Sequence, residues 1–124
     1  MKKYISTTQA PAAVGPYSQA VLSGNTLYLS GQIGLDPQTQ QMETTFEEQA
    51  KRVFSNIRAV LKEAGYSFSD VTKVTVYLTD MANFAQLNDI YGTFFEPPCP
   101  ARSCIAVAAL PKNALVEIEV VAGK

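Results

Sequence analysis

A chain of 124 residues, of which 47% are hydrophobic and 17% charged, has the size and composition of one globular domain, residues 1–124. The net charge is −1 and the sequence pI is about 5.3, with no apolar run long enough to cross a membrane. The basic residues are scattered, which argues against a nucleic-acid partner. The absence of histidine excludes Ser-His-Asp and Cys-His catalysis and any histidine metal site.

The N-terminus begins with Met1-Lys2-Lys3, but the next residues are polar and no apolar segment of a signal peptide follows. We therefore expect a cytoplasmic protein. Its two cysteines, Cys99 and Cys104, are too few for a disulfide framework or a four-cysteine zinc site. A catalyst built from this chain must use Arg, Glu, Tyr, Ser, Asn, Cys or backbone groups.

The first third of the chain predicts a loop or edge strand followed by a hairpin. Residues 1–15 contain Pro11, Gly15 and several Ser and Thr residues, residues 15–22 lead into a strand, and 26–30 return after a Ser-Gly-Asn turn. Residues 31–37 then hold two glycines and a proline. Glycines at a strand end indicate a bulge or a close approach of the backbone to another group. No phosphate-binding glycine motif is present.

A strong helix signal begins at Thr45, where Thr45-Phe46-Glu47-Glu48 forms a capping box, and the apolar stripe continues until Gly65. On the polar side, Glu47 with Lys51 and Glu48 with Arg52 have the spacing of favourable ion pairs. This helix is therefore predicted to expose a salt-bridged face to solvent.

The middle of the chain predicts a strand and a second helix. Residues 71–79 alternate between apolar and polar, Asp80 can cap a helix over about 82–95, and the proline-rich stretch 96–100 ends it.

The last quarter of the chain, residues 100–122, predicts two strands over 103–109 and 114–121. The Leu-Pro-Lys-Asn sequence between them suits a turn, so we expect these strands to form a hairpin. The first strand is apolar on both faces and should be covered on both.

In the second strand the period of two places apolar side chains on one face and carboxylates on the other. Val116, Ile118 and Val120 are the predicted core face, opposite Glu117 and Glu119.

Arg102 stands at the head of the first of these strands, and a glutamate is expected on the neighbouring strand. Two interpretations are open. The arginine is either a rim charge in a surface salt bridge worth about 0–1 kcal/mol, or a carboxylate clamp beside an acid or base.

The order of elements is ββαβαββ, an α+β domain with two helices and five or six strands. Two helices can cover only one face of such a sheet. Since the strand after Arg102 is apolar on both faces, we expect another subunit to cover the second face.

The motifs of the chain, in order and at matching spacings over residues 4–122, resemble those of the Rid family of reactive-intermediate deaminases, also called the YjgF family. The matching segments are GPYSQAV (15–21), SGQI (30–33), DP (36–37), NI (56–57), AVL (59–61), VYLTDM (76–81), Asn88 with Tyr91 and FF (94–95), PARSCI (100–105), LP (110–111) and VEIE (116–119).

This resemblance implies a chorismate-mutase-like fold, a homotrimer with ligand clefts between subunits, and no cofactor or metal. It implies hydrolysis of 2-imino and enamine acids, such as 2-aminoacrylate, 2-iminopropanoate and 2-iminobutanoate, to 2-keto acids and ammonia. Such intermediates are released by pyridoxal-phosphate enzymes.

The resemblance also implies roles for particular residues. Arg102 binds the substrate carboxylate, and Glu117 positions or activates the attacking water. Tyr17 and Asn88 line the cleft, whereas Ser30, Gly31 and Cys104 contribute mainly through position and backbone. Two departures from the family pattern concern only local loop shape: Gln40-Gln41, where a glycine-containing turn is common, and Cys99, where a large apolar residue is common.

Two alternatives to an imine deaminase remain open. A trimeric protein that binds small carboxylates would use Arg102 equally well but would need no general base. An endoribonuclease, an activity described for some Rid relatives, conflicts with the missing histidine and the acidic pI.

Overall fold

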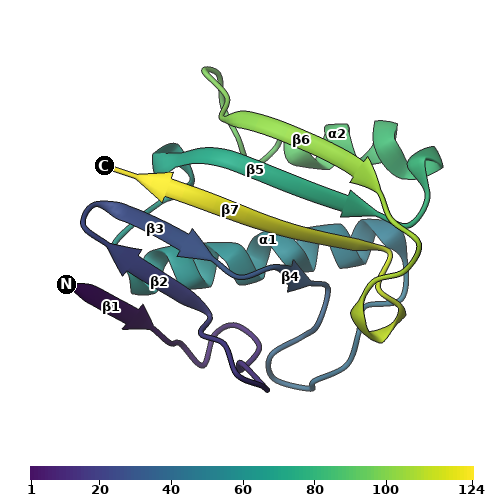
Figure 1. The fold of residues 1–124 in the computed structure, drawn as a ribbon. Helices are drawn as coiled ribbons and strands as arrows, with labels where there is room; N and C mark the ends of the chain where they lie inside the picture. Colours follow the sequence, from purple (N-terminus) through teal and green to yellow (C-terminus); the bar gives the residue numbers. More distant parts are fainter.

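The computed structural model describes residues 1–124 and shows a mixed seven-stranded sheet with both helices on one face (Figure 1). The strands are β1 (Lys2–Ile5), β2 (Ala20–Ser23), β3 (Thr26–Leu29), β4 (Gln32–Ile33), β5 (Val71–Leu78), β6 (Ala101–Ala106) and β7 (Val116–Gly123), and the helices are α1 (Phe46–Glu63) and α2 (Phe84–Tyr91). Three short 3₁₀ turns span Phe68–Asp70, Met81–Asn83 and Pro111–Asn113. The predicted α+β class is confirmed, with the short β1 and β4 raising the number of strands above the five or six expected.

The strands lie in the order β1-β2-β3-β7-β5-β6, and β4 continues beside β7. The long strands β5 and β7 form the centre of the sheet, and the side chains of Val74, Val76, Val116 and Ile118 are fully buried on its helix-covered face. This confirms the predicted core face of β7. The capping box of Thr45 and Glu48 is also present.

The predicted hairpin of the last two strands is wrong. β6 pairs in parallel with β5, and β7 pairs antiparallel with β5 on its other side, so β5 separates β6 from β7. The chain passes from β5 through α2 to β6, which is a βαβ unit, and such units make parallel neighbours. The 3₁₀ turn at Pro111–Asn113 therefore belongs to a connection that crosses the end of β5.

α2 is shorter than the predicted span of 82–95. The Asp80 side chain accepts a hydrogen bond from the Ala82 amide, but this cap begins the 3₁₀ turn that precedes α2. Neither α1 nor α2 has the length and apolar character needed to cross a membrane.

A bulge follows β3 at the position of Ser30 and Gly31. Tyr28 pairs with Val121 and Gln32 with Ile118, so four steps along this strand correspond to three along β7. One extra residue therefore lies between β3 and β4. A bulge bends the strand and redirects its side chains, as the glycine pattern predicted.

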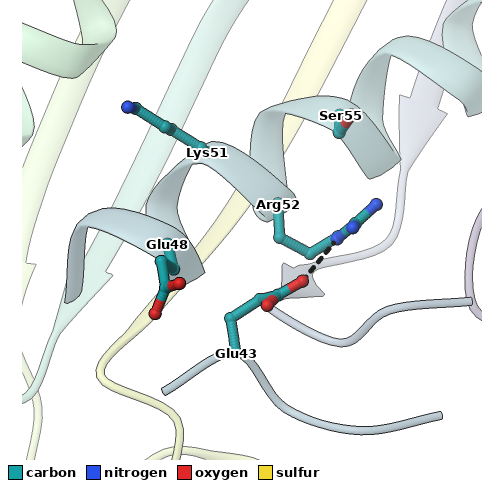
Figure 2. Close-up of a pocket in the computed structure, with 5 residues that line it drawn as sticks. All are labelled: Glu43, Glu48, Lys51, Arg52 and Ser55. Atoms are coloured by element: carbon teal, nitrogen blue, oxygen red, sulfur yellow. Dashed lines mark hydrogen bonds and ion pairs between the residues drawn. The ribbon is translucent and has the colours of Figure 1, made fainter. Parts of the chain in front are cut away.

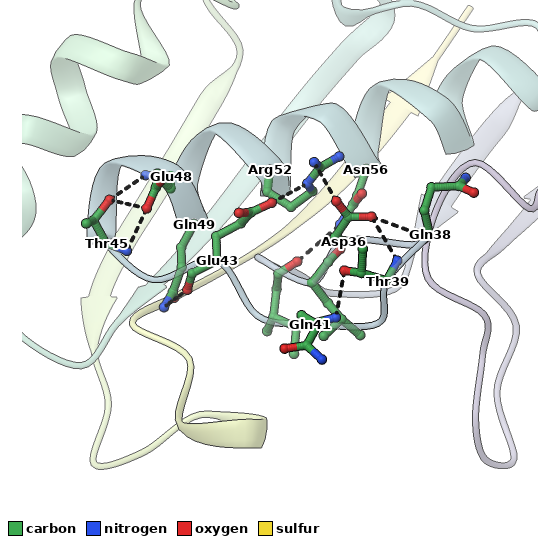
Figure 3. A network of polar contacts seen from close by, with 12 residues as sticks. Asp36, Gln38, Thr39, Gln41, Glu43, Thr45, Glu48, Gln49, Arg52 and Asn56 are labelled. Atoms are coloured by element: carbon green, nitrogen blue, oxygen red, sulfur yellow. Dashed lines mark hydrogen bonds and ion pairs between the residues drawn. The ribbon is translucent and has the colours of Figure 1, made fainter.

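The loop between β4 and α1 is tied to the helix by buried and half-buried polar side chains (Figure 3). Arg52 donates to Glu43 at 3.0 Å and to Asp36 at 3.1 Å. The predicted pair of Glu47 and Lys51 is present at 2.9 Å, whereas Arg52 turns away from Glu48 toward the loop. Two half-buried carboxylates outcompete one exposed carboxylate because they are less screened by solvent.

Two fully or almost fully buried amides extend this network. The Asn56 side chain donates to the carbonyls of Ile33 and Leu35, and Gln49 accepts from the Leu115 amide at 2.8 Å. Gln49 thereby fixes the start of β7. The loop passes so close to α1 that a Cβ at Gly34 would lie 2.6 Å from the Cα of Gln49.

The turn at Gln40 supplies a prediction on stability. Gln40 adopts a left-handed backbone, with φ of 61°, which costs a non-glycine residue about 1–2 kcal/mol. A glycine at position 40 would remove this cost, but part of the gain in stability is offset because glycine loses more entropy on folding. We expect Gln40→Gly to raise the melting temperature by about 2–4 °C.

Gln41→Gly is the matched control, because Gln41 does not have a positive φ. We expect it to lower the melting temperature in the same calorimetric scan. An equal effect of the two substitutions would contradict the role of the backbone conformation.

Candidate active site

Glu117 lies on the face of the sheet that the helices leave open. It alternates along β7 with Val116 and Ile118, which are fully buried on the helix side, and its own side chain is half-buried. Burial raises the pKa of the Glu117 carboxyl above its ordinary value, and the negative charge of Glu119 raises it further. Glu117 is therefore the carboxylate of this chain best suited to hold or return a proton.

Gly31 lies against the Glu117 carboxylate. A Cβ at position 31 would collide with the carboxylate oxygen and with its carbon, so only glycine allows the bulge to approach this closely. The backbone around the bulge therefore shapes the surroundings of Glu117.

A cavity of about 520 Å³ opens beside Glu117. Of the residues predicted for the site, Tyr17, Ser30, Gly31 and Glu117 all line it. Tyr17 is 52% exposed and lies in the segment that precedes β2. The structure thus brings four of the predicted site residues together.

Ser30 and Gln19 hold the wall of this cavity. The Ser30 hydroxyl donates to the Ser18 carbonyl at 2.6 Å, next to Tyr17. The buried Gln19 amide accepts from the Thr7 amide at 2.7 Å and donates to the Pro11 carbonyl at 2.7 Å. Ser30 therefore holds the backbone next to Tyr17, and its positional role in the site stays a prediction.

The other predicted residues form a second cluster on β6 and α2. The Arg102 guanidinium donates to the Asn88 side-chain oxygen at 2.8 Å. Its central carbon lies 4.8 Å from the centre of the Tyr91 ring and 5.6 Å from that of Phe84. Cys104 is half-buried two residues further along β6, and burial raises the pKa of its thiol, which favours the inert neutral form.

The Arg102 cluster leaves a charged guanidinium without a carboxylate. Arg102 takes part in none of the three ion pairs of the chain, all of which involve residues of α1. Its planar fork is held by one amide and by two rings, which fix its orientation and leave donors free for a ligand.

One chain does not bring the two clusters together. Arg102 pairs with Val74, whose side chain is buried on the helix side, whereas Glu117 pairs with Tyr77 on the open side. The two residues are therefore on opposite faces of the sheet, with β5 between their strands. The expectation that Arg102 stands near a glutamate of the adjacent strand is wrong within a single chain, because it followed from the incorrect hairpin.

Two groups of residues were missed by the sequence interpretation. Phe84 and Tyr91 were not among the predicted site residues, although their spacing from Asn88 places all three on one side of α2. Lys112, in the connection between β6 and β7, lines the Glu117 cavity, and no sequence signal distinguished it from a turn residue.

A separate hollow of about 260 Å³ on α1 is lined only by polar and charged residues, including Glu43, Lys51 and Arg52 (Figure 2). Its arginine is bound to Glu43 and Asp36, and its lysine to Glu47. Both basic side chains are already ion-paired within the chain, so this hollow is not a candidate site. The chain has no cluster of three His, Cys, Asp or Glu side chains that could hold a metal ion.

The family model described as Endoribonuclease L-PSP, which covers the YjgF and Rid proteins, matches residues 7–124. The chain belongs to the Rid family. It is 50% identical to a mouse Rid protein named 2-iminobutanoate/2-iminopropanoate deaminase, over 98% of this chain and 91% of the mouse protein.

Solved Rid structures share the whole fold. The crystal structure of RidA from an Antarctic Psychrobacter has a TM-score of 0.96 at 49% identity, covering 98% of this chain and 99% of that one. The structure of Escherichia coli TdcF with bound serine has a TM-score of 0.94 at 42% identity, covering 98% of both chains. These likenesses support the chorismate-mutase-like fold expected of a Rid protein.

Proposed function

We propose that this Rid protein hydrolyses 2-imino and enamine acids, including 2-aminoacrylate, 2-iminopropanoate and 2-iminobutanoate, to 2-keto acids and ammonia. The observation that supports this most directly is the oriented Arg102 guanidinium without an internal carboxylate partner. It matches an α-carboxylate by two parallel hydrogen bonds. The mouse relative named as a deaminase supports the same assignment.

We further propose that the complete site forms between subunits of a homotrimer. Arg102 and Glu117 face opposite sides of one sheet, so a site that contains both needs a second copy of the chain. The open face also leaves Tyr4, Tyr28 and Ile105 about half exposed or more, with no helix over them. A neighbouring copy would bury this apolar surface.

In the proposed reaction, Arg102 holds the substrate carboxylate, and an enamine first gains a proton on its carbon and loses one from its nitrogen to become the imine. Glu117 accepts a proton from a water molecule as the water oxygen bonds to the carbon of the C=N group. The nitrogen receives that proton from Glu117 and then the proton of the new hydroxyl group, so that the C–N bond breaks and ammonia leaves as the C=O bond forms. Positioning of this kind contributes up to about 7–11 kcal/mol, and a general base about 10²–10⁴-fold.

The description of the family model as an endoribonuclease raises a second activity. A histidine-dependent ribonuclease mechanism is not available to a chain without histidine. The basic side chains of Lys51 and Arg52 are bound to carboxylates, which weakens any phosphate-binding surface on α1. Salt-dependent RNA affinity that disappears on removal of Arg102 would revive this alternative.

The deciding experiment measures keto-acid release by a threonine dehydratase that turns over serine or threonine, with and without the purified protein. We expect the wild type to speed the appearance of pyruvate or 2-ketobutyrate beyond the spontaneous rate, and Arg102→Ala not to. If neither protein differs from buffer, the deaminase proposal is wrong and a carboxylate-binding protein becomes the better interpretation.

A further inference from the structure

Lys112 occupies the boundary between two cavities. It lines the cavity of about 520 Å³ that contains Glu117, and also a neighbouring cavity of about 490 Å³ beneath residues 11–14. Among all residues that line either cavity, Lys112 is the one with a positive charge. Lys112 is therefore the one cation that an anionic group could contact in this space beyond Glu117.

The backbone at Lys112 is unfavourable for its residue type. Lys112 has φ of 55° and ψ of 29°, and Asn113 follows with φ of 58°. Asparagine tolerates the left-handed region, but lysine does so at a cost of about 1–2 kcal/mol. Strained backbones of this kind cluster at ligand-binding positions, where the conformation directs a side chain.

Lys112 also has no electrostatic partner within the chain. Lys51 is paired with Glu47, and Lys124 donates to the Gly65 carbonyl, whereas Lys112 takes part in no ion pair and donates no side-chain hydrogen bond. Its ammonium is therefore available to a ligand, without loss of an internal contact.

We propose that Lys112 forms a second anion subsite in the Glu117 cavity, so that the substrates include imino acids with a side-chain carboxylate, the imines of acidic amino acids. This inference rests on the proposed deaminase function and names a wider substrate class for the same site. Lysine suits the role because its flexible stem can follow side chains of different length.

The charges of the cavity support a separate subsite. Arg102 is already assigned to the α-carboxylate, and Glu117, next to the reacting carbon, repels any further carboxylate. A substrate with two carboxylates therefore needs a cation away from both residues. Lys112 lies in the connection between β6 and β7. Glu117 is the other charged residue that lines its cavity, and Asp36 lines the neighbouring one.

Binding of 2-oxoglutarate and 2-oxopentanoate to the trimer tests the subsite, because these keto acids have the same chain length and differ in the terminal carboxylate. Calorimetric titration compares the wild type with Lys112→Met, which keeps most of the side-chain volume. We expect Lys112→Met to weaken the binding of 2-oxoglutarate up to about fivefold and to leave the affinity for 2-oxopentanoate unchanged. Lys62→Met, on α1 outside the cavity, should change neither.

Lys112→Gly serves as a second variant, because glycine accepts the left-handed backbone and keeps the connection folded. It should show the same selective loss. In a steady-state assay the imine of glutamate should show a raised KM and an unchanged kcat in both variants, with no change for the imine of norvaline.

The possible results separate the two proposals. If the wild type binds both keto acids and Lys112→Met weakens both equally or neither, the subsite is wrong while the proposed function stands. If the wild type binds neither keto acid, or binds 2-oxopentanoate alone, the subsite is wrong, and the keto-acid release assay decides the proposed function separately.

Discussion

Arg102→Lys is expected to lower deaminase activity by at least about 10²-fold while the protein keeps its fold and oligomeric state. The lysine ammonium retains the charge but lacks the planar fork that grips a carboxylate by two parallel bonds. It also loses the stacked contacts with Tyr91 and Phe84 and the fixed bond to Asn88. Initial rates of keto-acid release, with mass measured by light scattering, provide the comparison.

Arg58→Lys is a matched control for the loss of a stacked guanidinium. Arg58 lies 5.2 Å from the ring centres of both Phe68 and Phe94, in an arrangement like that of Arg102, but it is on α1 and away from the proposed site. We expect it to retain wild-type activity. A fully active Arg102→Lys enzyme would remove the carboxylate clamp from the mechanism.

Mixed trimers test whether the site lies between subunits. Arg102→Ala and Glu117→Gln should each be inactive alone, but in randomly mixed trimers about a quarter of the interfaces combine an intact Arg102 with an intact Glu117. Co-refolding the two variants should therefore restore up to about a quarter of the wild-type rate. A mixture as inactive as its components would show that both residues act within one chain, contrary to the observed sheet faces.

The local features of the fold follow from the sequence because each depends on neighbouring residues. Three such features are found as predicted: the capping box at Thr45, the alternation of Val116 and Ile118 with Glu117, and the close approach of the backbone at Gly31 to another group. Each reflects a hydrogen bond, a strand period or a close approach that a few residues determine. The resemblance to the Rid family, which was predicted from short motifs, is also confirmed, since the family model matches residues 7–124.

The pairing of the last two strands was mispredicted because it is a long-range property. Leu110-Pro111-Lys112-Asn113 has the composition of a hairpin turn, and local turn chemistry cannot reveal that β5 lies between β6 and β7. The strand–helix–strand order of residues 71–106 held the better signal, since it favours parallel pairing of β5 and β6.

The same error affected the candidate site. The types of the charged residues could be chosen from the sequence, but the face on which Arg102 lies depends on its register with Val74. Only that register shows that the guanidinium and the Glu117 carboxylate point to opposite sides. The relation between the two clusters therefore had to come from the structure.

Glu117→Gln is expected to lower kcat by about 10²–10⁴-fold, because the amide cannot accept a proton from the attacking water. Binding of a keto acid through Arg102 should persist, so the loss should appear in kcat more than in KM. Glu119→Gln is the matched control on the same strand and face, with its carboxylate accepting a bond from the Tyr77 hydroxyl. We expect it to keep the wild-type rate at neutral pH.

The pH profile adds a sharper test of the same residue. Glu117 must be ionised to act as a base, and burial together with the Glu119 charge raises its pKa, so activity should fall with decreasing pH earlier than for an ordinary glutamate. Glu119→Gln removes the second cause and leaves the first. The acid limb of its kcat profile should therefore move to lower pH while the neutral plateau stays in place. An acid limb that does not move, or one that survives in the residual activity of Glu117→Gln, would assign the titration to a different group and leave Glu117 without the role of base.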